Sequence, residues 1–354
     1  MPPPATRPGG ASAGAMFSIV MPLWNKRHTL AATVATVLGQ SWQGFELVVV
    51  DDGSTDGGAG LLAAFDDGRI RVLAQANAGP GAARNAGMEA ARHDWIAFLD
   101  ADDLWLPDHL AELDRIRRRF PEAGLIGTAF VRRGRDELDP PARPVPPVIA
   151  EIDYFEREAA GEPILCASTA AIPRSTYSLL GGFGNDLHGQ DSEYWARIAL
   201  ERPVATSSRV TAVYRLGTGG VTDRALHTRR HGRLRRLGDL GPVMALLAER
   251  YPEIENAGKR SAIDRFVDYR LRLSLRGAAR AGDFAALRAM PALYPRPPRA
   301  GDRLILAIAR LPTPLARAFY ELGFGAKALL RRLRRKLRGP APTYFGLLEG
   351  GHAD

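Results

Sequence analysis

The sequence predicts an α/β fold, in which a mostly parallel sheet is flanked by helices on both faces and is followed by an α-helical C-terminal region. Short apolar runs alternate with segments of helical spacing over the first 120 residues. Two of these runs end in clustered carboxylates, and the chain beyond about residue 226 is rich in Ala, Arg and Leu. Strict alternation of strand and helix implies right-handed crossovers and hence parallel neighbouring strands.

The expected elements follow in order along the chain. The predicted strands are Phe17 to Leu23, Phe45 to Val50, Ile70 to Leu73 and Trp95 to Leu99. The predicted helices are Thr29 to Leu38, Gly60 to Phe65, Ala82 to Ala91 and a last one from Pro107 to about Phe120. Apolar runs rich in β-branched residues are typical of buried parallel strands, and proline suits the first turn of a helix. From Arg132 to Pro147 the chain is charged and rich in proline, which indicates a surface loop or lid.

Composition excludes several classes of protein. With 45% hydrophobic and 25% charged residues, the 354-residue chain can bury a sizeable core. A single cysteine, Cys166, excludes an internal disulfide framework and fits a reducing compartment. No run approaches the ~18 apolar residues of a membrane span. We therefore expect a cytoplasmic protein.

The net charge of +9 is unevenly distributed. Residues 229–338 carry 26 Lys and Arg against nine Asp and Glu, whereas the rest of the chain carries 22 against 30. In residues 327–338 leucines share one helical face and cations cover the others. This pattern predicts peripheral contact with the inner, anionic face of the cell membrane, and a solvated arginine-rich helix is the alternative. Nucleic acid is not expected, since no aromatics for base stacking are interleaved.

The most informative positions are the carboxylates that follow two strands. Asp51 and Asp52 end the second predicted strand, and Asp100, Asp102 and Asp103 end the fourth. The carboxyl ends of parallel strands meet at the edge where open α/β sheets bind ligands. Clustered carboxylates repel one another unless a cation lies between them. Because Mg²⁺ and Mn²⁺ complete their coordination with phosphate oxygens, these acids predict a metal-bound diphosphate. Turn and capping chemistry is the alternative.

Further motifs belong to the same edge. Pro22-Leu23-Trp24-Asn25 ends the first strand, and the glycine-rich segment 79–87 opens a helix whose N–H groups and Arg84 suit an anion. With Gln40-Ser41-Trp42 and Trp105-Leu106-Pro107, the order and spacing of these motifs over residues 17–120 resemble those of the family 2 glycosyltransferases, which have a GT-A fold.

The resemblance implies a binding site for a nucleotide-diphospho-sugar donor. The positions carried over to donor binding are Pro22, Trp24, Asn25, Asp51, Asp52, Arg84, Asp100, Ala101 and Arg215. Asp52 would accept from the ring N–H of the base, which suits UDP and equally dTDP. Asp102 would hold Mn²⁺ or Mg²⁺ on the diphosphate, with Asp103 as a supporting residue or a helix cap, and Arg215 would reach the leaving diphosphate.

An inverting transfer also needs a general base for the acceptor hydroxyl. The resemblance assigns this role to Asp191, with Glu193 in reserve and N-capping of the helix as the alternative role for Asp191. Gly181-Gly182-Phe183 and Arg197 match the family pattern, whereas Gln190 stands where the family has Glu. His188 is a further candidate, as a late metal ligand or an acceptor-pocket residue.

These roles imply a division of the chain into parts. Residues 1–15 are expected to form a disordered leader and 16–225 a GT-A domain, with a nucleotide-binding half at 16–120 and an acceptor half at 148–225. Residues 226–354 form the basic helical region. The acceptor would be a glycan or a lipid-linked molecule.

Two other functions stay open on the sequence. A sugar-phosphate nucleotidyltransferase has a similar sheet and paired acids, but it carries a glycine-rich loop where this chain has Trp24-Asn25-Lys26-Arg27. A catalytically idle scaffold with the same fold is the other alternative; the intact Asp102 and Asp191 argue against it, and the altered Gln190 keeps it open.

Overall fold

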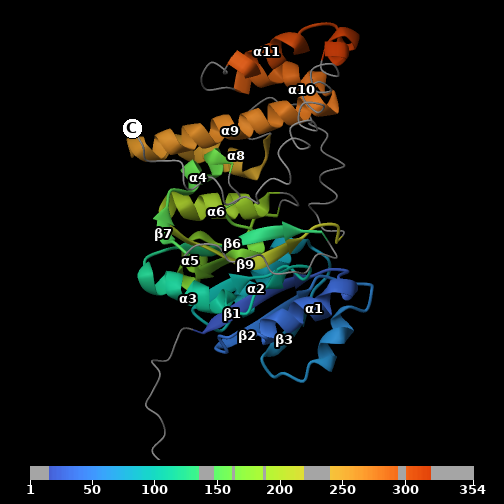
Figure 1. The fold of residues 1–354 in the computed structure, drawn as a ribbon, viewed down its shortest axis with the longest axis vertical. Coiled ribbons are helices and arrows are strands. Elements are labelled where there is room, and N and C mark those ends of the chain that lie inside the picture. Colours follow the sequence, from blue (N-terminus) through green and yellow to red (C-terminus); the bar gives the residue numbers. More distant parts are fainter. Residues whose placement is uncertain are drawn as a thin grey trace, which may run out of the picture. The chain divides into compact units, whose positions relative to one another are not determined.

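The computed structural model describes residues 16–134, 147–161, 164–185, 189–218, 240–293 and 300–319, and every statement below refers to these residues. They form two compact units, one of the described residues up to 270 and one of those from 271 onward (Figure 1). The first unit includes residues 240–270, so it extends past the boundary that composition suggests near 225.

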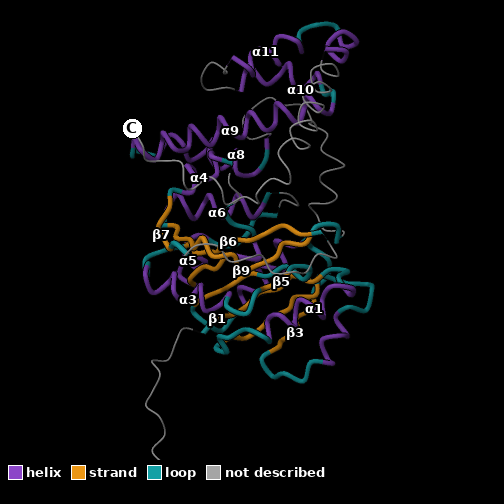
Figure 2. The backbone as a smooth tube through the Cα atoms, in the orientation of Figure 1, coloured by secondary structure: helices purple, strands orange, loops and turns teal. Residues whose placement is uncertain are grey.

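The strands of the first unit form one nine-stranded sheet (Figure 2). They are β1 (Phe17–Leu23), β2 (Phe45–Asp51), β3 (Ile70–Ala74), β4 (Trp95–Phe98), β5 (Leu104–Trp105), β6 (Leu125–Arg133), β7 (Ile149–Ile152), β8 (Ala170–Pro173) and β9 (Val204–Arg215). Their order is β3-β2-β1-β4-β8-β6-β9-β5, with β7 beside β9. The first four strands in the chain are mutually parallel, as expected, and β8 joins β4 antiparallel. The sheet is therefore mixed beyond β4.

The helices alternate with these strands in the first half of the chain. The helices of the first unit are α1 (Arg27–Leu38), η1 (Ala59–Ala64), α2 (Pro80–Ala90), α3 (His109–Arg119), α4 (Tyr154–Ala160), η2 (Ala167–Thr169), α5 (Arg174–Leu180), α6 (Gln190–Glu201), α8 (Pro242–Arg250) and η4 (Tyr251–Glu253). The helix α9 (Ala257–Ala281) runs from the first unit into the second, which also contains α10 (Phe284–Ala289), η5 (Met290–Leu293) and α11 (Ala300–Ala309).

The four predicted strands are confirmed to within one residue at either end. The helices differ from expectation in several details, and α1 and α2 each begin two residues earlier than predicted. The segment 59–64 is a 3-10 helix, and Pro107 precedes α3, whose N-cap is Asp108, instead of lying in its first turn. A backbone hydrogen bond from Ser41 N to the Pro107 carbonyl, at 2.7 Å, holds this proline in the connection before the helix.

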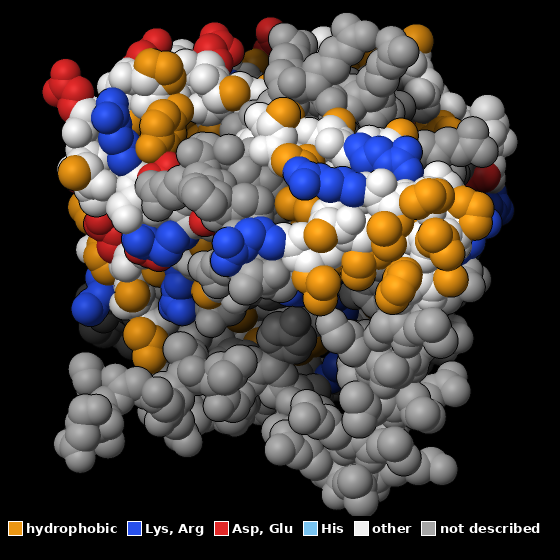
Figure 3. Space-filling model, turned by 90° about the horizontal axis from the view of Figure 1, so that it is seen from above, with side chains coloured by type: hydrophobic (Ala, Val, Ile, Leu, Met, Phe, Trp, Pro, Cys, Tyr) orange, Lys and Arg blue, Asp and Glu red, His pale blue; other side chains and the backbone are white. Residues whose placement is uncertain are grey.

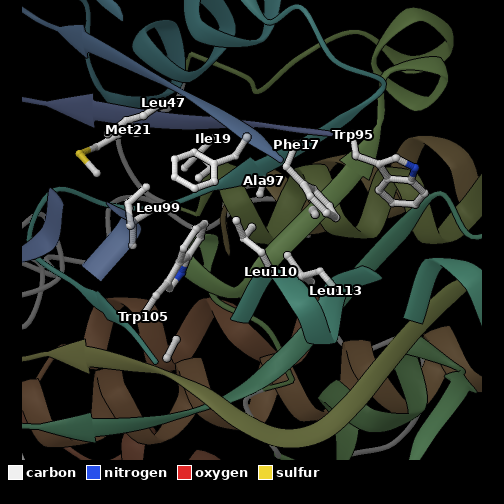
Figure 4. Close-up of a cluster of buried hydrophobic side chains, with 14 of the residues drawn as sticks. Phe17, Ile19, Met21, Leu47, Trp95, Ala97, Leu99, Trp105, Leu110 and Leu113 are labelled. Atoms are coloured by element: carbon white, nitrogen blue, oxygen red, sulfur yellow. The ribbon is translucent and has the colours of Figure 1, made fainter. Parts of the chain in front are cut away.

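Hydrophobic packing covers both faces of the sheet, as the buried strand patterns predict. On one face, alternate residues of β1 such as Phe17, Ile19 and Met21 lie in a cluster with Leu110 and Leu113 of α3 (Figure 4). On the other face, Val48 and Val50 pack with Ala83 of α2. Because side chains alternate along a strand, one apolar run supplies both layers.

The second unit exposes apolar side chains. Leu304, Leu315 and Phe319 are each more than half exposed, and Arg303 and Arg310 are exposed near them in the sequence. Hydrophobic and basic side chains gather on the face seen in Figure 3. No helix in the described ranges is long and apolar enough to cross a membrane. Residues 327–338, for which membrane contact is predicted, lie outside the described residues.

Candidate functional site

The sheet places three of the motif-bearing strand ends side by side. In β1, Leu23 lies opposite Asp51 of β2, and Val20 lies opposite Phe98 of β4. All three strands are parallel, so the residues that follow them emerge at one edge. Pro22 lies opposite Val50 in this register, and Trp24, 37% exposed, comes directly after β1.

The turn after β2 is held by side chains of the β1 edge. Asn25 adopts a positive φ of 51°, and its side chain accepts from Thr55 N at 2.8 Å. Its own N–H donates to Ser54 Oγ at 3.1 Å, while Asp51 Oδ1 accepts from Ser54 N at 2.9 Å. Asparagine tolerates this left-handed conformation better than most residues. Asp51 and Asn25 therefore shape the turn as well as lining the edge.

The carboxylate of Asp52 is 2% exposed and is bound by the loop that follows β3. Oδ1 accepts from Ala78 N and Gln75 Nε2, both at 2.8 Å, and Oδ2 accepts from Gly79 N at 2.9 Å. A carboxylate oxygen can accept two hydrogen bonds, so Oδ2 retains capacity for one more donor. The sequence pointed to Asp52 but not to these partners, which lie 23 to 27 positions away.

Arg84 lies at the centre of a group of carboxylates. Its side chain is buried, and Nη2 donates to Asp100 Oδ1 at 2.5 Å. Burial by itself lowers the pKa of Arg84. The charge of Asp100, with smaller contributions from Asp191 and Asp102, raises this pKa above its usual value. The structure thus brings together four residues that the sequence singled out from three separate segments.

Asp102 is paired with a residue that the sequence analysis did not assign to the site. Lys26 Nζ lies 2.6 Å from Asp102 Oδ2, and Thr218 Oγ1 donates to the same oxygen at 2.6 Å. The neighbouring Ala101 is 2% exposed, and its carbonyl accepts from Thr29 Oγ1 of α1 at 2.9 Å. Lysine directly after Asn25 was visible in the sequence, but nothing there indicated its partner 76 positions away.

Asp103 and Arg215 join β9 to the strand-end acids. Asp103 Oδ1 accepts from Arg215 N at 2.9 Å, and Oδ2 accepts from Ser168 Oγ at 2.5 Å. The guanidinium of Arg215 donates to the Asp102 carbonyl. Burial, followed by the charges of Asp102 and Asp100, raises the pKa of Asp103 well above its usual value. Asp103 is therefore a buried supporting residue and does not cap a helix.

The oxygen donors at this edge fit a metal that shares its coordination with a ligand. Among the described residues, no three His, Cys, Asp or Glu side chains form a group that could hold a metal by themselves. Asp100 is paired with Arg84 and Asp102 with Lys26, so a cation bound by either carboxylate would compete with a basic side chain. Mg²⁺ is commonly bound by one or two carboxylates plus phosphate oxygens, so one carboxylate beside a diphosphate is sufficient.

Asp191 lies in the first turn of α6, whose N-cap is Gly189. It is not the N-cap residue, but its Oδ1 accepts from Ser192 N, one of the free N–H groups of the same first turn, at 2.8 Å. Its neighbour Gln190 is 6% exposed and packs against the start of α2. A Cβ on Gly81 would lie 2.0 Å from Gln190 Oε1, so glycine is what permits this approach.

The reserve base and the Gly-Gly-Phe motif have structural partners. Glu193 Oε1 accepts from Arg197 Nε at 2.8 Å, and Arg197 also donates to the carbonyls of Leu180 and Gly182. Asn85 clamps Phe183 by accepting from its N–H at 2.8 Å and donating to its carbonyl at 2.9 Å. These contacts connect the glycine-rich helix α2 to the segment before α6. His188 lies outside the described residues.

Sequence reasoning missed an acidic residue near Asp191. Glu158 of α4 is partly buried, and burial raises its pKa to about 7, against the opposing charge of Arg270 and with a smaller rise from Asp191. Tyr154 of the same helix is 4% exposed and also lies within the influence of Asp191. The sequence around the seven-residue helix α4 has no pattern that would have predicted that Glu158 lies near Asp191.

Residues 18–179 match the model of Glycosyl transferase family 2. The chain is 43% identical over 111 residues to the succinoglycan biosynthesis protein ExoO of Rhizobium meliloti, an alignment covering 31% of this chain and 30% of that protein.

A second relative is the UDP-Glc:alpha-D-GlcNAc-diphosphoundecaprenol beta-1,3-glucosyltransferase WfgD of Escherichia coli. The chain is 40% identical to it over 96 residues, which cover 27% of this chain and 38% of that protein. The alignments therefore span about a third of the length of these relatives.

Among solved structures, S. aureus TarS 1-349 in complex with UDP-GlcNAc has a similar fold. The TM-score is 0.63 at 15% identity, and the match covers 87% of this chain and 92% of that one. At this identity the likeness shows the fold, and it confirms the expected GT-A-type architecture.

Proposed function

We propose that this protein is an inverting glycosyltransferase that moves a sugar from a UDP-linked donor, or equally a dTDP-linked one, to a glycan or lipid-linked acceptor. The observation that carries the proposal is the buried guanidinium of Arg84, whose Nη2 contacts Asp100 and on which the charges of Asp191 and Asp102 also act. Residues proposed for the donor side and for the acceptor side, far apart in the chain, thus influence the charge of the same guanidinium. The names of WfgD and of the TarS complex support a uridine nucleotide as the donor group.

The donor's diphosphate would bind beside Arg84 and Asp102. The Nε of Arg84 is buried and makes no hydrogen bond within the described part of the chain. Asp102 would hold Mn²⁺ or Mg²⁺, which when bound supplies Lewis-acid stabilisation of the charge that develops on the leaving diphosphate. The nucleobase would donate a hydrogen bond to Asp52. It would use the carboxylate oxygen that can accept one more hydrogen bond, or it would replace the amide of Gln75.

Transfer with inversion is a single displacement at the anomeric carbon. The acceptor oxygen forms the new bond as the bond from that carbon to the diphosphate oxygen breaks. Asp191 would take the proton of the acceptor hydroxyl during this step. The reserve base Glu193 is engaged with Arg197, which favours Asp191 for the role.

Thermal unfolding tests the donor site, and a paired substitution tests the base. UDP, dTDP, GDP, CDP and ADP would each be added with Mn²⁺ and then with a chelator. A ligand at a hundred times its Kd stabilises the fold by about 2.7 kcal/mol, which is easily measured. We expect a metal-dependent shift with UDP or dTDP. No shift with any nucleotide would favour the idle scaffold.

For the base, release of UDP from UDP-sugars would be compared between Asp191→Asn and the matched control Glu193→Gln. Loss of general-base catalysis should lower turnover roughly a hundredfold or more in Asp191→Asn. The control should retain far more activity. Glu193→Gln loses an ion pair with Arg197, but it keeps Asp191, the group that accepts the proton. Near-normal turnover of a folded Asp191→Asn protein would contradict the assignment.

A further inference from the structure

The carboxylate assigned to the metal already has a cationic partner within the chain. Lys26 Nζ lies 2.6 Å from Asp102 Oδ2, and the two side chains are 13% and 14% exposed. Lys26 Nζ also donates to the Thr218 carbonyl at 3.0 Å, while the hydroxyl of Thr218 donates to Asp102. Three segments of the chain thus meet in one closed hydrogen-bonded group.

The fold holds Lys26 in place from both sides. The preceding Asn25 is fixed by the turn after β2, and the following Arg27 donates its N–H to Asp56 Oδ2 at 2.8 Å. Lys26 is itself the N-cap residue of α1, and its carbonyl accepts from Leu30 N at 2.9 Å. The backbone on both sides of Lys26 is therefore held by hydrogen bonds.

The charges favour one sequence of binding events. Asp102 and Lys26 neutralise each other, so a divalent cation arriving alone must separate this pair and then lie beside an ammonium. A sugar diphosphate brings about two further negative charges, which balance the cation and leave Lys26 with an anionic oxygen to bind. Metal and donor together are accommodated at little electrostatic cost, whereas metal alone is opposed.

We propose that Lys26 is the resident counter-ion of Asp102, that it competes with the divalent cation for this carboxylate in the nucleotide-free protein, and that it binds the donor's diphosphate once cation and nucleotide occupy the site. The inference rests on the proposed donor site. It makes Lys26 a determinant of the order in which metal and nucleotide bind.

The test measures the affinity for Mn²⁺ by electron paramagnetic resonance. Each protein is titrated once without nucleotide and once with saturating UDP. Lys26→Met removes the charge and keeps the length of the side chain. Arg27→Met is the matched control, since Arg27 is the adjacent cation and its side chain donates to the backbone of Asp56 and Gly57 instead. Far-UV circular dichroism and the melting temperature establish that each variant is folded.

Hydrogen bonds to charged groups contribute enough that their loss changes an affinity about tenfold. Lys26→Met should therefore bind Mn²⁺ about tenfold more tightly than the unmodified protein in the absence of nucleotide, and Arg27→Met should not. Adding Asp102→Asn to Lys26→Met should abolish this gain. UDP in the presence of Mn²⁺ should bind Lys26→Met more weakly than the unmodified protein.

Unchanged or weaker Mn²⁺ binding by folded Lys26→Met would overturn the inference and leave the proposed function standing, provided that UDP and Mn²⁺ still bind the unmodified protein. Failure of every protein to bind Mn²⁺ or UDP would overturn both. Equal tightening in Arg27→Met would attribute the effect to general charge and would overturn the specific role of Lys26.

Discussion

The contact between Gly81 and α6 gives a sharp test of how the donor and acceptor sides are joined. A Cβ added to Gly81 would lie 2.0 Å from Gln190 Oε1 and 2.7 Å from the Gly184 carbonyl oxygen. The amide of Gln190 can rotate away, but the Gly184 oxygen is backbone and moves only with its loop. Overpacking of this kind costs about 1–3 kcal/mol, and alanine recovers about 0.5–1 kcal/mol in a helix. We expect Gly81→Ala to lose about 1–2 kcal/mol of stability.

Turnover should fall as well, because Gln190 directly precedes Asp191. A displacement of about 1 Å in a catalytic group can lower a rate on the order of a hundredfold. Urea unfolding and UDP release from UDP-sugars measure the two effects. Gly60→Ala is the matched control, because nothing lies within 4 Å of the Cβ that it would add.

The double variant Gly81→Ala with Gln190→Ala separates the two contacts. It removes the clash with the amide and keeps the one with the Gly184 carbonyl, so most of the stability loss should persist. If Gly81→Ala behaves like Gly60→Ala in both stability and turnover, the close approach of α2 to α6 does not constrain the protein and the reasoning is refuted.

Two further predictions concern pH. Glu158 has a pKa of about 7 in the folded protein, against an ordinary value of 4.5. Between these two pH values the folded state holds a proton that the unfolded chain has released. The free energy of unfolding therefore falls as pH rises from about 4.5 to 7. The loss of stability over this range is on the order of 3 kcal/mol. Urea unfolding at pH 5 and pH 8 should show a smaller difference in stability for Glu158→Gln than for the unmodified protein. An equal difference in the two proteins would contradict the prediction. His109 is fully buried, stacks on Trp105 with ring centroids 4.1 Å apart, and burial lowers its pKa to about 3. Because the pKa is lowered in the folded state, the unfolded chain binds a proton below pH 6.5 that the folded protein does not bind. The free energy of unfolding therefore decreases as pH falls from 6.5 toward 3, by about 2 kcal/mol at pH 5. His109→Phe should lose this acid sensitivity, and retention of the full slope in that variant would assign it to other groups.

The sequence by itself determined the local elements and the edge of the sheet that carries the acids. The first strand begins at Phe17 and ends at Leu23 as its apolar run predicts, Asp51 ends the second strand, and Asp100 to Asp103 come after the fourth. Periodicity and strand-helix alternation are properties of contiguous residues, so they can be read from the chain without knowing its partners.

The tertiary structure decided which side chains meet. Asp52 binds the backbone of residues 78 and 79, and Asp102 pairs with Lys26, although neither partner follows from spacing. The antiparallel entry of β8 beside β4 likewise depends on packing of the later half against the earlier one. Such contacts join residues tens of positions apart. Their geometry is fixed by how whole elements pack, and a linear pattern of residue types does not contain that information.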